Sequence, residues 1–190
     1  HSFSRRQRQM CIRDRDGTDP ESLTKGEIEG RKAALEAIAA LKEYMPGCSA
    51  GKLRNFGMTI GIRDTYKIDS VYNLSDEDVK NECRFEDSVG IYPEFIDGFG
   101  VLVLPTTGRY MHIPYRSLLP KNIKGLLVVG RAIGGSNIAH AATRNMACCT
   151  VTGQGAGVAA AETIKNKTSL NSVNISNVQK LLSKQNVRVF

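Results

Sequence analysis

The segment from Gly130 to Ala161, GRAIGGSNIAHAATRNMACCTVTGQGAGVAAA, limits the possible folds of this chain more than any other feature. It is rich in glycine and alanine, and its only formal charges are those of Arg131 and Arg144. It follows the apolar run Leu126–Val129, which is typical of a strand buried on both faces. We expect a helix from about Asn145 to about Lys165. A strand, a glycine turn and a helix N-terminus together present backbone N–H groups to an anionic ligand.

The glycines of this segment have two possible explanations. Glycine inside a helix costs about 1 kcal/mol relative to alanine, so the run GQGAG at 153–157 needs a physical reason. One reason is tight helix–sheet packing, and the other is a helix laid against a flat cofactor ring. Neither glycine cluster matches G-x-G-x-x-G, and no acidic residue follows about 20 residues later to bind a ribose.

Composition bounds the class of protein. The chain has 190 residues, 41% hydrophobic and 24% charged, which is ordinary for a globular protein. No apolar run approaches the ~20 residues of a membrane helix, so we expect a soluble protein. The five cysteines are odd in number and lack zinc-site spacing. They indicate free thiols in a reducing compartment, the cytoplasm, and no metal site.

Much of the net charge of +7 lies in the N-terminal tail. Residues 1–15 hold five arginines and one aspartate, so the rest of the chain has 21 basic and 18 acidic residues, a net of +3. This small excess disfavours a nucleic-acid-binding protein. The tail imitates a mitochondrial transit peptide. Its QMCIRDR run, however, resembles translated sequencing-adapter read-through, and we expect residues 1–15 to be non-native or disordered.

Local signals predict the elements of residues 16–119. A capping box of Thr24 and Glu27 begins a helix that Pro46-Gly47 ends. Ser75 caps a second, short helix. Alternating runs predict two strands around a turn at Arg63-Asp64, and three further strand-like pieces suggest an antiparallel sheet. The predicted strands are Phe56–Ile62, Tyr66–Tyr72, Val89–Ile96, Val101–Leu104 and Tyr110–Ile113.

Two periodic patterns complete the prediction. The helix that begins at Thr24 places apolar residues roughly on one face. These are Ile28, Leu35, Ile38, Ala39 and Leu41. An amphipathic helix near the C-terminus has Ser176 as its N-cap, with Val178, Leu181 and Leu182 inward.

Two stretches of the sequence form a specific pattern. They are IPYRSLLPKNIKGLLVVGRAIGG, from Ile113, and ATRNMACCTVTGQGAGVAAA, from Ala142. This pattern resembles the C-terminal part of the FAD-dependent oxidoreductases of the fumarate-reductase-like group, which runs IPYRSL-P, LLVAGR, R-x-M-x-x-C and GQAAG-x-AAA. The upstream runs LTKGEIEGRKA, GIRDTYKIDSVYNLSDEDV and FIDG are similar to that family in order and spacing.

The resemblance implies an α/β fold, the C-terminal half of an FAD/NAD(P)-binding, Rossmann-like flavoprotein. Residues 16–119 would form part of an antiparallel β substrate or cap region, and residues 120–190 would return to complete the FAD-binding domain. The G-x-G-x-x-G unit would lie in a missing N-terminal half, so we expect the chain alone to bind FAD poorly and to be inactive. The complete protein would transfer hydride between flavin and a small molecule. The alternative is a non-catalytic binding or interaction module derived from a flavoprotein.

The resemblance also assigns residues to the site. Arg131 would pair with the cofactor pyrophosphate, and the helix that begins near Met146 would direct its N-terminus at the flavin. The cofactor-binding residues would be Gly130, Arg131, Ala132, Met146, Gly153, Gln154 and Gly157. The catalytic residues, acting as charge stabiliser, proton donor or anion clamp, would be Arg144, His112, Tyr115 and Arg116.

Structural roles stay open for several of these residues. Arg144 could instead form a salt bridge to the sheet, and His112 could be a structural histidine. Arg63 could contact substrate or form a structural ion pair. Cys148 and Cys149 could be redox-active or simply small buried residues. Many relatives carry a His-Glu pair after the GR loop, whereas this chain has Asn137 and Ile138 there, with His140 further on.

Overall fold

The computed structural model describes residues 16–98, 101–106 and 108–190. The chain divides into two compact units, residues 1–65 and 66–190, and each is considered by itself. The tail predicted at residues 1–15, with Cys11, lies outside the described residues. The four described cysteines are free thiols, as predicted.

The first unit contains one long helix, α1 (Pro20–Tyr44). The helix ends before Pro46-Gly47 as predicted, but the predicted start at Thr24 is wrong. Asp19 is the N-cap, and its carboxylate accepts hydrogen bonds from the N–H groups of Glu21 and Ser22. A proline in the first turn fixes φ near the helical value and has no N–H to leave unsatisfied. Thr24 donates its hydroxyl to the Pro20 carbonyl at 2.9 Å, inside the helix.

The apolar residues of α1 do not face a core within the described residues. Ile28 is 51% exposed and Leu35 is 54% exposed. The strands predicted at Phe56–Ile62 and Tyr66–Tyr72 are wrong, because both segments lack the hydrogen-bonded ladder that a strand requires. Ser70 alone forms an isolated antiparallel bridge, to Pro120.

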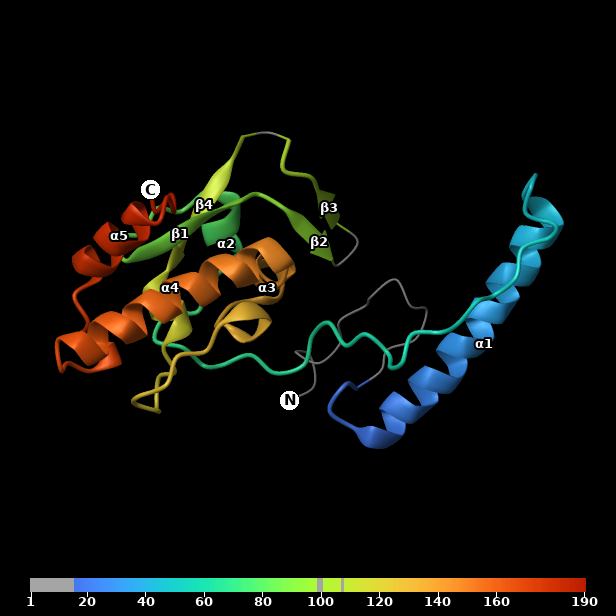
Figure 1. Ribbon diagram of the computed structural model, residues 1–190, viewed down its shortest axis with the longest axis horizontal. Coiled ribbons are helices and arrows are strands. Elements are labelled where there is room, and N and C mark those ends of the chain that lie inside the picture. Colours follow the sequence, from blue (N-terminus) through green and yellow to red (C-terminus); the bar gives the residue numbers. More distant parts are fainter. Residues whose placement is uncertain (1–15, 99–100, 107) are drawn as a thin grey trace. The chain divides into compact units, whose positions relative to one another are not determined.

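The second unit contains two small antiparallel sheets, where the sequence predicted one antiparallel sheet (Figure 1). The predicted strand Val89–Ile96 is divided into β1 (Ser88–Pro93) and β2 (Ile96–Gly98). β1 pairs with β4 (Tyr110–Pro114), with Ile91 opposite His112. β2 pairs with β3 (Val101–Val103), with Asp97 opposite Leu102.

Helix α4 (Met146–Lys165) packs on β1, and α5 (Ile175–Lys184) packs beside it on the same strand. Figure 1 shows α4 running alongside β1. The predicted bounds of α4 are confirmed. α5 begins one residue after its N-cap Asn174, so the predicted cap at Ser176 is wrong, although Val178 and Leu182 are fully buried as predicted.

Two short helices extend the core. Ser75 caps α2 (Asp76–Lys80), as predicted, in a capping box with Asp78. α3 (Asn137–Thr143) packs on α2 and β2 and leads directly into α4. Short 3-10 turns connect these elements. They are η2 (Tyr115–Leu118), η3 (Gly130–Ala132) and η4 (Leu170–Ser172).

The buried strand predicted at Leu126–Val129 is wrong for this structure. The segment has no ladder partner among the described residues, and Leu126 and Val129 are 42% and 39% exposed. An apolar run becomes a buried parallel strand only when strands pair with it on both edges. The described chain is therefore a mixture of helices and two small antiparallel sheets, which is compatible with an α/β fold.

Candidate functional site

Gly130 forms a sharp turn between the partly exposed segment Leu126–Val129 and the rest of η3. Its φ is +72°, a left-handed conformation that favours glycine. Its N–H donates to the Thr152 hydroxyl at 3.0 Å, and Thr152 is fully buried on α4. This bond fixes η3 against α4, so Gly130, Arg131 and Ala132 belong to the same surface as that helix.

The N-terminus of α4 has no side-chain cap in the described part of the chain. Asn145 is the N-cap residue, but its amide donates backwards to the carbonyl groups of Ala142 at 3.0 Å and Ala141 at 3.5 Å. Met146, the first helical residue, is 88% exposed. An uncapped N-terminus presents unsatisfied N–H groups and the positive end of the helix dipole to an approaching ligand.

The glycines of α4 lie on two different faces. A Cβ at Gly155 would lie 2.7 Å from Val89 Cβ, so this glycine lets the helix touch β1. A Cβ at Gly153 or Gly157 would meet no atom within 4 Å among the described residues. Packing therefore explains Gly155 but not the other two. Between them Gln154 donates to the Gln185 side chain at 2.9 Å.

The earlier glycines of the segment serve packing. A Cβ at Gly134 would lie 1.8 Å from Ser70 Oγ, and one at Gly135 would lie 3.3 Å from the Leu74 carbonyl oxygen. The two glycines thus allow the segment 70–74 to lie against η3 and the start of α3. They leave no space for a ligand at that point.

Arg144 joins α3 to α4 and is held by β2. Its side chain is 7% exposed, and Nη2 lies 3.5 Å from Asp97 Oδ2. Nη2 also donates to the Asp97 backbone carbonyl. The salt bridge to the sheet that the sequence left open is present, and it places the guanidinium against β2. In the chain, Arg144 is the residue before Asn145, the N-cap of α4.

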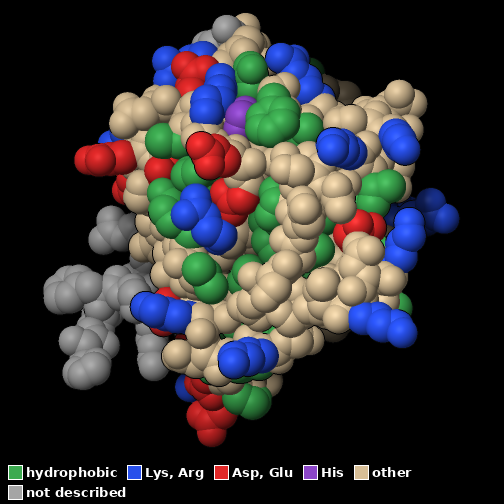
Figure 2. Space-filling model, turned by 90° about the vertical axis from the view of Figure 1, so that its left-hand side faces the viewer, with side chains coloured by type: hydrophobic (Ala, Val, Ile, Leu, Met, Phe, Trp, Pro, Cys, Tyr) green, Lys and Arg blue, Asp and Glu red, His purple; other side chains and the backbone are tan. Residues whose placement is uncertain are grey.

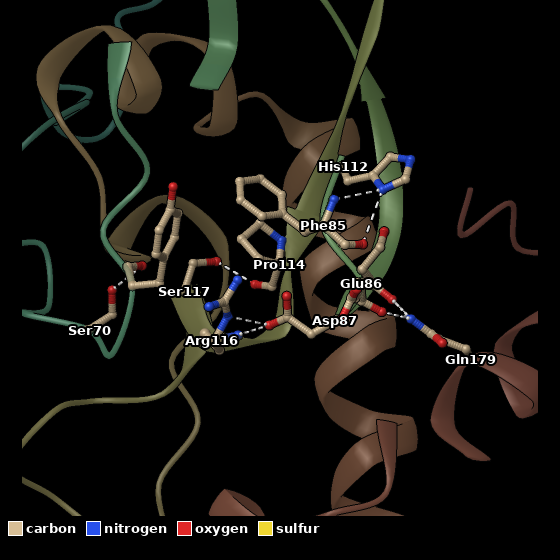
Figure 3. Close-up of polar contacts among 11 residues, drawn as sticks. Ser70, Phe85, Glu86, Asp87, His112, Pro114, Arg116, Ser117 and Gln179 are labelled. Atoms are coloured by element: carbon tan, nitrogen blue, oxygen red, sulfur yellow. Dashed lines mark hydrogen bonds and ion pairs between the residues drawn. The ribbon is translucent and has the colours of Figure 1, made fainter. Parts of the chain in front are cut away.

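The candidates on and after β4 are held by the segment Phe85–Asp87, as Figure 3 shows for His112 and Arg116. Phe85 N–H donates to His112 Nδ1 at 3.1 Å. Arg116 Nε donates to Asp87 Oδ2 at 3.0 Å, and its side chain is 46% exposed. Tyr115 donates its hydroxyl to the Leu170 carbonyl at 3.0 Å.

Burial changes the acidity of two of these groups. The imidazole of His112 is 4% exposed, and its Nε2 has no hydrogen-bond partner among the described residues. Burial lowers the pKa of His112, and burial raises the pKa of Tyr115 to about 12. Both groups therefore favour their neutral forms at neutral pH.

The structure brings together η3 and α4, which carry the cofactor-binding candidates, whereas the side chains of the catalytic candidates have different bonding partners. Gly130–Ala132 and the exposed face of α4 are adjacent. Arg144 is paired with β2, His112 with Phe85, and Tyr115 with η4. Asp97 and Thr152 were not among the site residues predicted from the sequence. Asp97 belongs to the run FIDG, which resembles the family pattern, whereas no motif in the sequence pointed to Thr152.

The remaining candidates are buried or half-buried side chains. His140 is 2% exposed in α3, and Arg63 is half-buried in the first unit. Cys148 is fully buried, as the packing alternative expects, and burial raises its pKa. Burial also raises the pKa of Cys149, which Arg131 opposes. The described residues hold no cluster of three metal-ligating side chains.

Two surface properties bear on partners. Lys and Arg side chains are interspersed with Asp and Glu on the face that Figure 2 shows, and do not form one continuous patch there. Among the described helices, none is long and apolar enough to cross a membrane.

Comparison with known proteins bears on all of these residues. The model of a family described as FAD dependent oxidoreductase matches residues 2–182. The match covers most of the chain and includes every candidate cofactor-binding and catalytic residue. Neither the curated proteins nor the solved structures gave a match.

Proposed function

The chain belongs to the family of FAD-dependent oxidoreductases, whose cofactor is FAD, and from this premise we propose that η3 and α4 form the returning half of a Rossmann-like FAD site. The residues that contact FAD in this proposal are Gly130, Arg131, Ala132, Met146, Gly153, Gln154 and Gly157. The substrate is an unidentified small molecule, and hydride passes between it and the flavin.

The observation that carries this proposal is the open glycine face of α4. Gly153 and Gly157 are one helical turn apart, and a Cβ added at either position would meet no atom of another described element within 4 Å. Two glycines at positions with room for a side chain each reduce helix propensity by about 1 kcal/mol relative to alanine. Close approach of a flat ring system to the helix backbone gives them a function, and the residues present fit the cofactor.

The charges around this face also fit FAD. Arg131 is exposed on η3, and its guanidinium is suited to bidentate binding of a pyrophosphate. The uncapped N-terminus of α4 favours negative charge in front of Met146. Together they give the two acidic parts of the bound cofactor, its pyrophosphate and its reduced ring, a positively polarised environment.

FAD, when bound, supplies the two-electron chemistry, and the protein supplies binding, orientation and electrostatics. Arg144 stabilises negative charge at the N-terminus of α4. Arg116 is the anion clamp for substrate, since its guanidinium is half-exposed and is oriented by Asp87. His112 and Tyr115 are neutral and buried, so a role in proton donation requires that substrate or the cofactor region reaches them.

We propose that a partner covers apolar side chains that are exposed on α4 and on the segment before η3. Leu126, Val129, Met146 and Ile164 are 42%, 39%, 88% and 79% exposed. We assign this cover to a preceding half of the same protein, which would also supply the phosphate-binding glycine turn. A non-catalytic module whose apolar face binds another protein is the second candidate, and the same exposed residues support it.

The test is Arg144→Ala in the complete flavoenzyme, with Arg109→Ala as the matched control. Arg109 also belongs to an ion pair, with its Nε 2.9 Å from Glu94 Oε2. We expect Arg144→Ala to slow flavin reduction in stopped-flow measurements by more than its loss of thermal stability explains, and Arg109→Ala to leave the reduction rate near that of the wild type.

Two results would contradict the proposal. If Arg144→Ala reduces stability and the reduction rate in equal proportion, Arg144 is structural. If the complete protein binds no FAD, the non-catalytic module replaces the enzyme. A submicromolar FAD affinity of residues 1–190 alone, measured by fluorescence quenching, would remove the need for a preceding half.

A further inference from the structure

Asp97 contacts the Arg144 guanidinium with both its side chain and its backbone. Two groups of Asp97 face the same Nη2 atom, the carboxylate at 3.5 Å and the backbone carbonyl. Beside them, a Cβ at Gly98 would lie 3.1 Å from Ala141 Cβ and 3.6 Å from Arg144 Nη2. Glycine at 98 therefore lets β2 lie directly against α3 and the arginine.

This contact brings together parts of the chain that are distant in sequence. Asp97 and Arg144 are 47 residues apart. Asp97 is fixed by the β2–β3 pairing, in which it lies opposite Leu102. Arg144 is fixed by the corner between α3 and α4, where its N–H donates to the His140 carbonyl. A long arginine side chain has high rotamer entropy, so a second anchor restricts its head group to one place.

The ion pair is better suited to orienting the arginine than to stabilising the fold. The Asp97 side chain is 34% exposed, whereas that of Arg144 is 7% exposed. A partly hydrated carboxylate gains little from pairing, because water screens its charge. The buried guanidinium, by contrast, needs a nearby anion and acceptors to remain charged out of water.

We propose that Asp97 is a positioning residue that acts through Arg144, holding the guanidinium so that the site prefers reduced over oxidised flavin. The inference rests on the proposed function of Arg144. It also gives the β2–β3 hairpin a task, because the hairpin then connects the substrate region to the flavin region. Asp97 itself touches neither cofactor nor substrate.

The sign of one measurement separates positioning from simple electrostatics. Asp97→Asn removes a negative charge, and by charge alone this would favour the reduced flavin and raise the midpoint potential. If Asp97 instead positions Arg144, the substitution misplaces the cation and lowers the potential. The two explanations therefore predict opposite shifts from one variant.

The experiment is spectroelectrochemical titration of the FAD-loaded complete enzyme. We expect Asp97→Asn to weaken the preference for reduced flavin about tenfold, which is about 30 mV for a two-electron couple. Asp97→Glu, which retains the charge, should restore part of that preference. In an Arg144→Gln background Asp97→Asn should cause no further decrease. The control Glu94→Gln breaks the neighbouring ion pair with Arg109 and should leave the potential unchanged.

The outcomes distinguish the two hypotheses. A decrease in Arg144→Gln together with an unchanged or higher potential in Asp97→Asn overturns the positioning role alone. An unchanged potential in Arg144→Gln overturns the proposed function of Arg144, and the positioning role with it. Should Asp97→Asn fail to fold, an Asp97→Glu potential between those of the wild type and Arg144→Gln would confirm positioning. An Asp97→Glu potential equal to that of the wild type would assign Asp97 to charge alone and overturn positioning.

Discussion

Alanine substitutions at three glycines of α4 should change stability in opposite directions, depending on the face that each glycine occupies. A methyl group at Gly155 would lie 2.7 Å from Val89 Cβ and 2.9 Å from its Cγ2. Methyl groups at Gly153 and Gly157 would meet no described atom within 4 Å. The three positions lie in one helix and undergo the same chemical change, so each serves as a control for the others.

The expected magnitudes follow from two opposing effects. Each alanine gains about 1 kcal/mol in helix propensity. At Gly155 overpacking opposes this gain, because Val89 is fully buried on β1 and cannot move aside. Two distances below 3.0 Å place that cost in the upper part of the usual range, about 2–3 kcal/mol. Gly155→Ala should therefore lose about 1–2 kcal/mol net, whereas Gly153→Ala and Gly157→Ala should each gain up to about 1 kcal/mol.

Urea unfolding followed by tyrosine fluorescence measures these differences. The chain has six tyrosines and no tryptophan. All the tyrosines except Tyr44 lie in the unit 66–190, which contains α4. With a urea dependence of about 1–3 kcal/mol/M, the midpoints of Gly155→Ala and Gly153→Ala should differ by about 1 M. Equal midpoints would refute the packing assignment of Gly155.

The same variants in the complete flavoenzyme test the cofactor assignment. Methyl groups on the open face would hold the flavin away from the helix backbone, so Gly153→Ala and Gly157→Ala should weaken FAD binding about tenfold, equivalent to about 1.4 kcal/mol. They would then be more stable as the apoprotein and weaker in binding. Stabilised variants with unchanged FAD affinity would show that the flavin does not approach these glycines.

Three further predictions concern single contacts. Thr152→Val removes the acceptor of the 3.0 Å hydrogen bond from Gly130 N–H and should lower the free energy of unfolding in urea by about 1 kcal/mol. Thr152→Ser, which retains the hydroxyl, should lose less stability. A larger loss in Thr152→Ser than in Thr152→Val would contradict a stabilising role of this bond. Asp19→Ala should reduce the helicity of α1 by circular dichroism, at a cost of about 1 kcal/mol, whereas Thr24→Ala should have little effect; the opposite result would return the N-cap to Thr24. Burial lowers the folded-state pKa of His112 below its usual value of 6.5. At a pH between the folded-state pKa and 6.5 the unfolded chain therefore binds more protons than the folded chain, so the free energy of unfolding should fall as the pH falls through this range. His112→Asn should reduce this pH dependence in thermal unfolding between pH 7.5 and 5, and an identical slope would exclude His112 as its source.

Short-range signals in the sequence predicted several elements correctly. The acidic turn after Ser75 predicted α2, and the small-residue run after Asn145 predicted α4, because capping and helix propensity act within a few residues. The same kind of signal misplaced the start of α1. Both Asp19-Pro20 and Thr24 are suitable starts, and the hydrogen bonds from Glu21 and Ser22 to Asp19 decide between them.

Contacts between distant segments could not be predicted in this way. The apolar run at Leu126–Val129 indicates a buried segment. A strand also needs partner strands to hydrogen-bond with, and the residues of the run do not specify these partners. The prediction of a strand at Phe56–Ile62 was wrong for the same reason. Alternation predicts an extended backbone, and the pairing that completes a ladder depends on other parts of the chain.

The sequence by itself determined the family and the place of the glycine-rich segment within it, because those depend on residue order alone. Only the tertiary structure separated Gly155, where a Cβ would clash with β1, from Gly153 and Gly157, where a Cβ would have room, since the three glycines have the same local sequence character. It alone also paired Arg144 with Asp97. The physical reason is that close packing and ion pairing act through space, between atoms that the chain brings together only when it folds.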